Sequence, residues 1–153
     1  MKLRIADIGD CRMLFEWAND NEIRKMALSS EPIEWESHKK WIEKKLSDPN
    51  SRIYIAINDQ GQPVGQIRFD IMGGGAEIDV HTKPNLRGKG IGTQIISFGT
   101  NQYFSETHVD TIHAIIKLKN IKSLKAFKNA GFKEVGQEII KEHGYFHLVK
   151  NRY

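Results

Sequence analysis

The sequence of 153 residues has one cysteine, four prolines and no long apolar run. Because Cys11 has no partner for an internal disulfide, we expect a protein of the reducing cytoplasm rather than a small disulfide-linked scaffold. No apolar stretch approaches the roughly 18 residues that a membrane helix needs, and the first ten residues contain no signal-peptide core. These absences predict a cytoplasmic protein that does not act at a membrane.

Nucleic-acid and metal signatures are also scarce. The net charge of +4 suits a ligand with several phosphates, but basic and aromatic residues do not interleave as they do on nucleic-acid platforms. Of the six histidines only His143 and His147 are four apart, and Gly144 lies in a β-rich run between them. We therefore expect no nucleic-acid partner and no metal site, in a single domain that spans residues 1–153.

Hydrophobic periodicity predicts the order β-α-α-β-β-β-α-β-α-β-β. The predicted strands are a short one opened by Leu3, Ile5 and Ile8, then residues 52–57, 64–70, 76–81, 111–116, 133–140 and 145–149. The predicted helices are one with Met13, Leu14 and Trp17 on its apolar face, then residues 22–28, 35–46, 91–104 and 121–130. On the third of these helices we expect Trp41, Ile42 and Leu46 to point inward.

The most informative segment is AEIDVHTKPNLRGKGIG, residues 76–92. A half-polar strand runs into a Pro-Asn turn and a glycine-rich loop, and an apolar helix follows at once. Glycines let backbone N–H groups approach a ligand closely, and a helix N-terminus adds a positive partial charge. The segment therefore predicts a phosphate or pyrophosphate site.

Two familiar phosphate loops do not fit this segment. A Walker loop needs Ser or Thr after its lysine, whereas Lys89 is followed by Gly90. A dinucleotide fingerprint needs GxGxxG and an acidic residue at the end of the next strand, whereas the spacing here is GxGxG and the next strand ends in Ile116-Lys117.

The pattern that does fit is R/Q-x-x-G-x-G/A, formed by Arg87, Gly90 and Gly92. A second motif follows within about 55 residues, at Asn120-x-x-Ser123-x-x-Ala126-Phe127-x-x-x-Gly131-Phe132. Together they resemble the GNAT superfamily of N-acetyltransferases, and the resemblance covers essentially the whole chain. It implies an α/β (α+β) fold with a mixed, mostly antiparallel central sheet of about 6–7 strands and helices on both faces. It also implies acetyl-CoA as co-substrate.

The resemblance assigns cofactor contacts residue by residue. Backbone N–H groups of the loop should bind the pyrophosphate, namely those of Arg87, Gly88, Lys89, Gly90, Ile91 and Gly92. A strand N–H near Val80 or His81 should face the reacting carbonyl, and Asn120, with Ser123, should contact the pantetheine arm or pyrophosphate. Phe127 stands where many members have a tyrosine that protonates the thiolate, so the general acid is unassigned between Tyr103 and Tyr145.

Glu77 is the leading candidate for the general base. Glu77, Asp79 and His81 alternate with Ile78 and Val80, so the polar side chains share one side of the strand. In histone-type members a strand that begins Ala-Glu-Ile carries the base at that glutamate, and Glu77 matches it. Burial beside the like charge of Asp79 would raise a carboxyl pKa towards the useful range, and Asp79 is the alternative base.

The acceptor amine is predicted from the opening of the chain. Residues 14–24 resemble bacterial enzymes that acetylate the 4-amino group of nucleotide-linked amino sugars, as in the pseudaminic acid pathway. The pocket residues implied are Trp17, Asn19, Asp20 and Arg24. The alternative is a ribosomal-protein N-terminal (alanine-type) acetyltransferase, and a third hypothesis is a non-catalytic CoA-binding sensor. Many such folds pair through sheet edges or C-terminal strands, which leaves a homodimer open.

Overall fold

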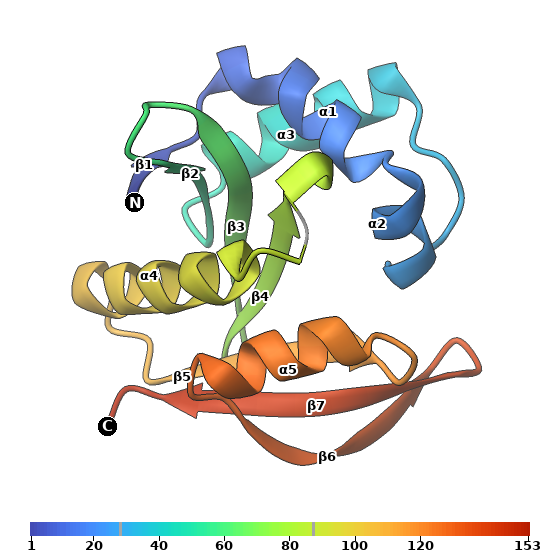
Figure 1. Cartoon of the computed structure of the whole chain (residues 1–153), viewed down its shortest axis with the longest axis vertical. Helices are drawn as coiled ribbons and strands as arrows, with labels where there is room; N and C mark the ends of the chain where they lie inside the picture. Colours follow the sequence, from blue (N-terminus) through green and yellow to red (C-terminus); the bar gives the residue numbers. More distant parts are fainter. Residues whose placement is uncertain (28, 87) are drawn as a thin grey trace.

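The computed structural model describes residues 1–27, 29–86 and 88–153, and its framework is one seven-stranded sheet (Figure 1). The strand order is β1-β2-β3-β4-β5-β7-β6, and every neighbouring pair is antiparallel except β4 and β5. The strands are β1 (Lys2–Ile5), β2 (Ser51–Ile57), β3 (Pro63–Met72), β4 (Gly75–Thr82), β5 (Thr111–Lys117), β6 (Lys133–Ile140) and β7 (His143–Asn151). The mixed, mostly antiparallel sheet agrees with the expectation from the sequence.

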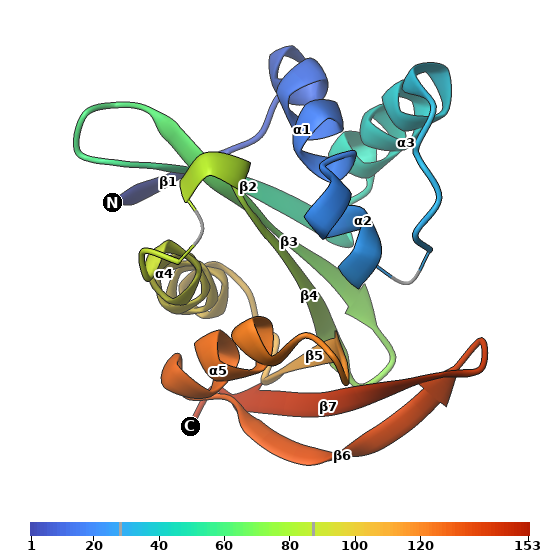
Figure 2. The same cartoon turned by 45° about the vertical axis from the view of Figure 1, so that its right-hand side comes forward.

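Helices cover both faces of this sheet (Figure 2). They are α1 (Cys11–Ala18), α2 (Asn21–Met26), α3 (Trp35–Ser47), α4 (Ile91–Glu106) and α5 (Ile121–Asn129), with 3-10 turns η1 (Ile8–Asp10) and η2 (Pro84–Leu86). The helices α1–α3 lie over one face, and α4 and α5 over the other. Among the helices described, none has the length and apolarity that a membrane span requires.

Three local predictions need correction. Ile8 lies in η1 and not in the first strand, because Asp7 and Asp10 form a capping box that turns the chain there. The second helix ends at Met26, before the predicted boundary at Leu28, which lies outside the described residues. Trp41 was expected inward with Ile42 on α3, but Ile42 is buried whereas 36% of Trp41 is exposed.

The core has one hydrophobic cluster on each side of the sheet. The larger cluster lies beneath α4 and α5, where Phe69 of β3 stacks on Tyr103 of α4 with ring centroids 4.1 Å apart. The smaller cluster joins α1 and α3 to β2 and contains Trp17, Ile42 and Ile55. Because the sheet is buried on both faces at its centre, its middle strands are held rigidly.

The strands β4 and β5 run side by side only at their starts. Their register consists of two residue pairs, Ala76 with Ile112 and Glu77 with His113. In contrast, β3 and β4 stay paired over eight residue pairs without a shift. β4 therefore keeps its place beside β3 and diverges from β5, so that the sheet splits beyond Glu77 (Figure 2).

The start of β4 generates the first prediction. Gly75 has a φ of 139°, and a Cβ at this position would collide with the main-chain carbonyl oxygen of Thr111. Such a conformation costs roughly 1–3 kcal/mol for a non-glycine residue, before the clash is counted. We expect Gly75→Ala to lower the free energy of unfolding by at least this amount in urea denaturation.

The matched control is Gly73→Ala, in the same turn. No atom lies within 4 Å of a Cβ at Gly73. This variant should match the stability of the wild type. Equal stability of the Gly75 and Gly73 variants would contradict the close approach of β4 and β5.

Candidate active site

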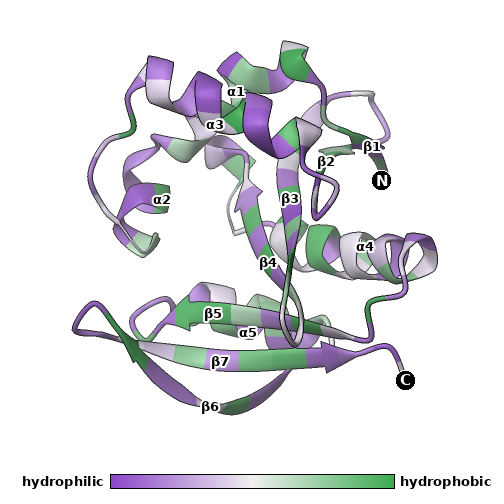
Figure 3. Cartoon of the chain, turned by 180° about the vertical axis from the view of Figure 1, so that it is seen from behind, coloured by the Kyte–Doolittle hydropathy of each residue, from purple (hydrophilic) through white to green (hydrophobic). Residues whose placement is uncertain are grey.

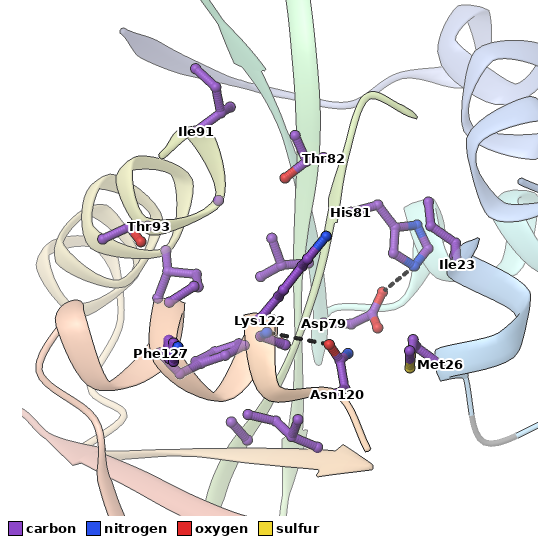
Figure 4. Close-up of a pocket in the computed structure, with 18 of the residues that line it drawn as sticks. Ile23, Met26, Asp79, His81, Thr82, Ile91, Thr93, Asn120, Lys122 and Phe127 are labelled. Carbon is purple, nitrogen blue, oxygen red and sulfur yellow. Dashed lines mark hydrogen bonds and ion pairs between the residues drawn. The ribbon is translucent and has the colours of Figure 1, made fainter. Parts of the chain in front are cut away.

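The split between β4 and β5 opens into a cavity of about 660 Å³ on the side of α4 and α5, here called the α5-side cavity. Figure 4 shows part of its lining, with Ile91 and Thr93 from α4, Asn120 and Phe127 from the region of α5, and Asp79 and His81 from β4. The predicted cofactor residues that line it are Val80, His81, Gly88, Gly90, Ile91, Gly92, Asn120, Ser123 and Phe127. The structure therefore brings together residues from two motifs that are 30 positions apart in the chain.

The glycine loop has the backbone geometry of an anion site. Gly88 and Gly90 have φ values of 78° and 75°, in the region that favours glycine, and α4 begins directly afterwards at Ile91. The N-terminus of α4 consequently presents backbone N–H groups and a positive partial charge at the cavity. Lys89 is exposed and is not a lining residue, whereas Arg87 lies outside the described residues.

Asn120 closes the opposite end of the same cavity. Its side-chain Oδ1 accepts a hydrogen bond from the Ser123 N–H at 3.2 Å, which caps the N-terminus of α5. Further along α5, Phe127 is buried and packs edge-on against Phe132 with ring centroids 5.0 Å apart. Phe127 thus contributes an apolar wall and has no hydroxyl group for proton transfer.

A second cavity of about 630 Å³ lies on the other face of the sheet, between β3, β4 and α1–α3, and is here called the α3-side cavity. The two cavities meet at β4, since they share the lining residues Met26, Ala27, Ile78, Asp79, His81 and Ile115. A molecule on either side can therefore reach the same short stretch of β4.

The polar face of β4 turns towards the α3-side cavity. Figure 3 shows hydrophilic and hydrophobic segments following one another along this strand, and Glu77, Asp79 and His81 all line the cavity. Burial raises the pKa of Glu77, and the charges of Asp70 and Asp79 raise it further, while Arg68 opposes them. A half-buried carboxyl with a raised pKa is a more basic carboxylate once it ionises.

Asp79 is held as an anion instead. Burial alone would raise its pKa, but the charges of His81 and Arg68 and a hydrogen bond from Gln66 outweigh it, so that the pKa lies below the ordinary value. The Gln66 Nε2 is 3.1 Å from Oδ2, Arg68 is 3.6 Å away, and the His81 Nε2 is 3.4 Å away (Figure 4). Of the two carboxylates, Glu77 is therefore the better proton acceptor.

The strand register also distinguishes Val80 from His81. The Lys83 N–H donates to the Val64 carbonyl on β3, and N–H directions alternate along an antiparallel strand. His81 consequently points its N–H towards β3, whereas Val80 points its N–H towards β5. Because β5 has diverged at this level, the Val80 N–H faces the split.

Of the four residues predicted to contact the acceptor, only Arg24 lines the α3-side cavity. Trp17 is 6% exposed and packs in the smaller core cluster. The Asn19 side chain holds the backbone N–H and C=O of Ile33, and Asp20 caps α2 by accepting from Glu22 N–H. These three side chains shape the chain that surrounds the cavity and do not form its wall.

The sequence interpretation missed other lining residues, because they come from separate elements. Trp41 lines this cavity where Trp17 had been expected, and the Arg68 guanidinium lies 4.8 Å from the centroid of the Trp41 ring. His38 also lines the cavity, and so does Tyr145, which the sequence had named only as a candidate general acid. Tyr103, one of the two general-acid candidates, lies instead in the core stack with Phe69.

Comparison with known proteins identifies the family. The family described as "Acetyltransferase (GNAT) domain" matches residues 1–133. The chain belongs to the GNAT acetyltransferases. It is an acetyl-CoA-dependent N-acetyltransferase, and the fold and motifs expected from the sequence are those of this family.

The chain is similar to several proteins named as acetyltransferases, two of which are named for an amine. Acetyltransferase PseH of Campylobacter jejuni is 26% identical over 124 residues, covering 80% of this chain and 76% of that protein. Aminoglycoside N(6')-acetyltransferase type 1 of Klebsiella pneumoniae is 22% identical, covering 98% and 82%. The fold superimposes on spermidine N-acetyltransferase from Vibrio cholerae, in complex with CoA and spermine, with a TM-score of 0.89 at 19% identity, covering 99% and 95%.

Asn120 generates the prediction from this cavity. Asn120→Ala removes the cap of α5 and should lower the free energy of unfolding by about 1 kcal/mol. It should also raise the KM for acetyl-CoA, because the amide lines the cavity that the loop and α4 border. Thermal unfolding and steady-state kinetics measure the two effects.

Asn120→Asp separates them. A carboxylate still accepts from the Ser123 N–H, so stability should be retained, while its negative charge should repel a phosphorylated ligand and raise the KM. An unchanged KM for acetyl-CoA in both variants would mean that Asn120 only caps the helix.

Proposed function

We propose that this GNAT enzyme transfers an acetyl group to the primary amine of a nucleotide-linked amino sugar, by direct attack within a ternary complex. The observation that carries the proposal is a pair of charged side chains in the α3-side cavity, Glu77 and Arg24, that have no ion-pair partner among the described residues. The proposal is also supported by the resemblance of residues 14–24 to bacterial enzymes that acetylate nucleotide-linked amino sugars, and the chain is similar to acetyltransferase PseH. In this arrangement acetyl-CoA occupies the α5-side cavity, and the amine approaches β4 from the α3 side.

Most charges that line the α3-side cavity are already paired. Asp70 accepts from Lys45 Nζ, Arg68 Nε and Ser51 Oγ at 2.8, 2.8 and 2.7 Å. Asp79 is held by Arg68 and His81, as described above. Within the described part of the chain, Glu77 and Arg24 are left with no ion-pair partner.

The Arg24 guanidinium is suited to an anion from the acceptor. Its NH1 donates to the Glu31 carbonyl at 3.1 Å, and its Nε is buried without a partner. Burial lowers the pKa of Arg24, and only the charge of Asp79 counteracts this. A phosphate group would supply the missing negative charge and accept the free N–H.

The two unpaired charges together favour an acceptor with both signs of charge. Glu77 suits an ammonium group and Arg24 suits a phosphate, and a nucleotide-linked amino sugar carries both. Aminoglycosides and polyamines carry several ammonium groups, and an ammonium group close to Arg24 would be repelled by the guanidinium. Their fit to this cavity is correspondingly poorer.

The chain's own groups account for the proton and charge movements. Acetyl-CoA supplies the activated thioester. Glu77 removes a proton from the ammonium, directly or through one water, and the Val80 N–H stabilises negative charge on the carbonyl oxygen. Asp79 holds the His81 ring in place, so we assign it a positioning role. Thiols have a pKa near ~8.5, which lets the sulfur leave as thiolate without an acid at Phe127.

Glu77→Gln tests the base. Because burial raises the pKa of Glu77 above its ordinary 4.5, the acidic limb of the kcat/KM profile should lie above that value and fall as pH decreases. The variant should lose roughly 10²–10⁴-fold in kcat, as expected for a general base, and should lose that limb.

Its stability provides the control. Glutamine removes a carboxylate whose ionisation burial disfavours, so the Tm at pH 7 should not fall. Asp79→Asn removes a stabilised anion and should lower the Tm, because Arg68 loses a partner. If Asp79→Asn abolished the acidic limb and Glu77→Gln preserved it, the base would be Asp79.

The acceptor is tested by CoA release, followed with a thiol reagent. We expect turnover with a UDP-linked 4-amino-4,6-dideoxy sugar at a kcat/KM well above that for kanamycin, spermidine or a peptide with a ribosomal-protein N-terminus. Arg24→Gln should weaken the binding of the sugar nucleotide more than that of the other amines, since it removes the positive charge that would face the phosphate. A peptide as best substrate would support the N-terminal acetyltransferase alternative and refute the sugar assignment.

A further inference from the structure

Among the described residues, three buried side-chain atoms lack any hydrogen-bond partner, and all three belong to the wall of one cavity. They are the Nε of Arg24, the Nε2 of His38 and the hydroxyl of Tyr145. A buried polar atom without a hydrogen-bond partner destabilises the folded state, and native proteins contain few such atoms. Their gathering in the α3-side cavity indicates that a bound molecule completes their hydrogen bonds.

His38 and Tyr145 are the most deeply buried of this set, at 4% and 1% exposure. They come from unrelated elements, α3 and β7, and so border the cavity from two directions. Tyr145 is paired across the sheet with Lys117, whose ammonium group donates to the Lys25 carbonyl on α2. The backbone pairing thus places Tyr145 beside β5, and its phenol is buried there with no hydrogen-bond partner for the hydroxyl among the described residues.

His38 is fixed in a comparable way by aromatic neighbours. Its ring lies 5.5 Å from that of Phe15 and 5.7 Å from that of Trp41. Burial lowers the pKa of His38, and the charges of Arg24 and His81 lower it further. The ring is consequently neutral at neutral pH, and one nitrogen donates while the other accepts.

We propose that His38 and Tyr145 determine acceptor specificity by hydrogen-bonding its neutral polar groups, hydroxyl or carbonyl, while Arg24 takes the anion and Glu77 the amine. This deepens the proposed function and rests on its assignment of the α3-side cavity to the acceptor. A sugar carries hydroxyl and acylamino groups of this kind. An acceptor that lacks them leaves two buried polar groups unpaired, which is a strong basis for rejection.

Tyr145→Phe is the sharpest test, because it removes one oxygen that has no partner. The wild type is first assigned its best acceptor from the panel above. The Kd of that acceptor is then measured calorimetrically on enzyme saturated with CoA, where no turnover occurs. We expect the Kd to rise about 10-fold in the variant, with an unchanged Kd for CoA and a Tm that does not fall.

Tyr54→Phe is the matched control. The Tyr54 hydroxyl donates to Glu106 at 2.7 Å, and the residue lines neither cavity. This variant should lower the Tm and leave acceptor binding unchanged, the opposite of Tyr145→Phe. His38→Phe should preserve the aromatic packing and weaken acceptor binding. His38→Gln should bind the acceptor more tightly than His38→Phe, because its amide can form a hydrogen bond.

The outcomes separate the two proposals. If the best acceptor of the wild type is an aminoglycoside, which carries hydroxyl groups, only the nucleotide-sugar assignment fails, and the variants are measured with that amine. If it is a polyamine, which has neither hydroxyl nor carbonyl groups, the specificity role fails as well. If Tyr145→Phe and His38→Phe bind the best acceptor as tightly as the wild type, the specificity role is overturned. A fall in kcat with unchanged acceptor Kd would also overturn it, because it would assign Tyr145 to the chemical step.

Discussion

The arrangement of this enzyme depends on β4 being paired along only one edge. Beyond Glu77 the strand is held by β3 alone, and the hydrogen-bonding groups that would have met β5 face an open split. Unpaired backbone groups are normally avoided in a sheet interior, because they cost free energy when buried. Here they provide a preformed polar edge that a thioester can occupy, and the rest of the fold keeps the split open.

Neighbouring charges give different ionisation properties to three carboxyl groups that the sequence alone does not distinguish, those of Asp70, Asp79 and Glu77. Asp70 and Asp79 are tied to lysine, arginine and histidine partners, which stabilise their charges and stiffen the cavity wall. Among the residues that the structure describes Glu77 has no ion-pair partner, and its burial beside two other carboxylates disfavours the charged form, although the charge of Arg68 opposes this. The same strand therefore contains one stabilised anion, Asp79, and one more basic carboxyl group, Glu77, which we propose as the base.

Much of the fold could be predicted from the sequence, and so could the residues that gather around the α5-side cavity, because those signals are local. Gly90 and Asn120 mark turns and caps that a short window reveals, and Glu77 follows from strand alternation. The acceptor side was harder, since Trp17 and Trp41 both lie on amphipathic helices, and periodicity does not show which ring faces a cavity. Tyr145 was found only as one of two candidates, and His38 has no sequence signal at all.

The two cavities open on opposite faces of one sheet, and this affects the order in which ligands can bind and dissociate. Under the proposed assignment the coenzyme and the amine reach β4 from opposite faces, so neither has to leave before the other can bind or dissociate. Substitutions in α1–α3 can change the lining of the α3-side cavity without changing the glycine loop, α4 and α5, which border the α5-side cavity. A fold of this kind can change its acceptor specificity while it retains its binding of acetyl-CoA.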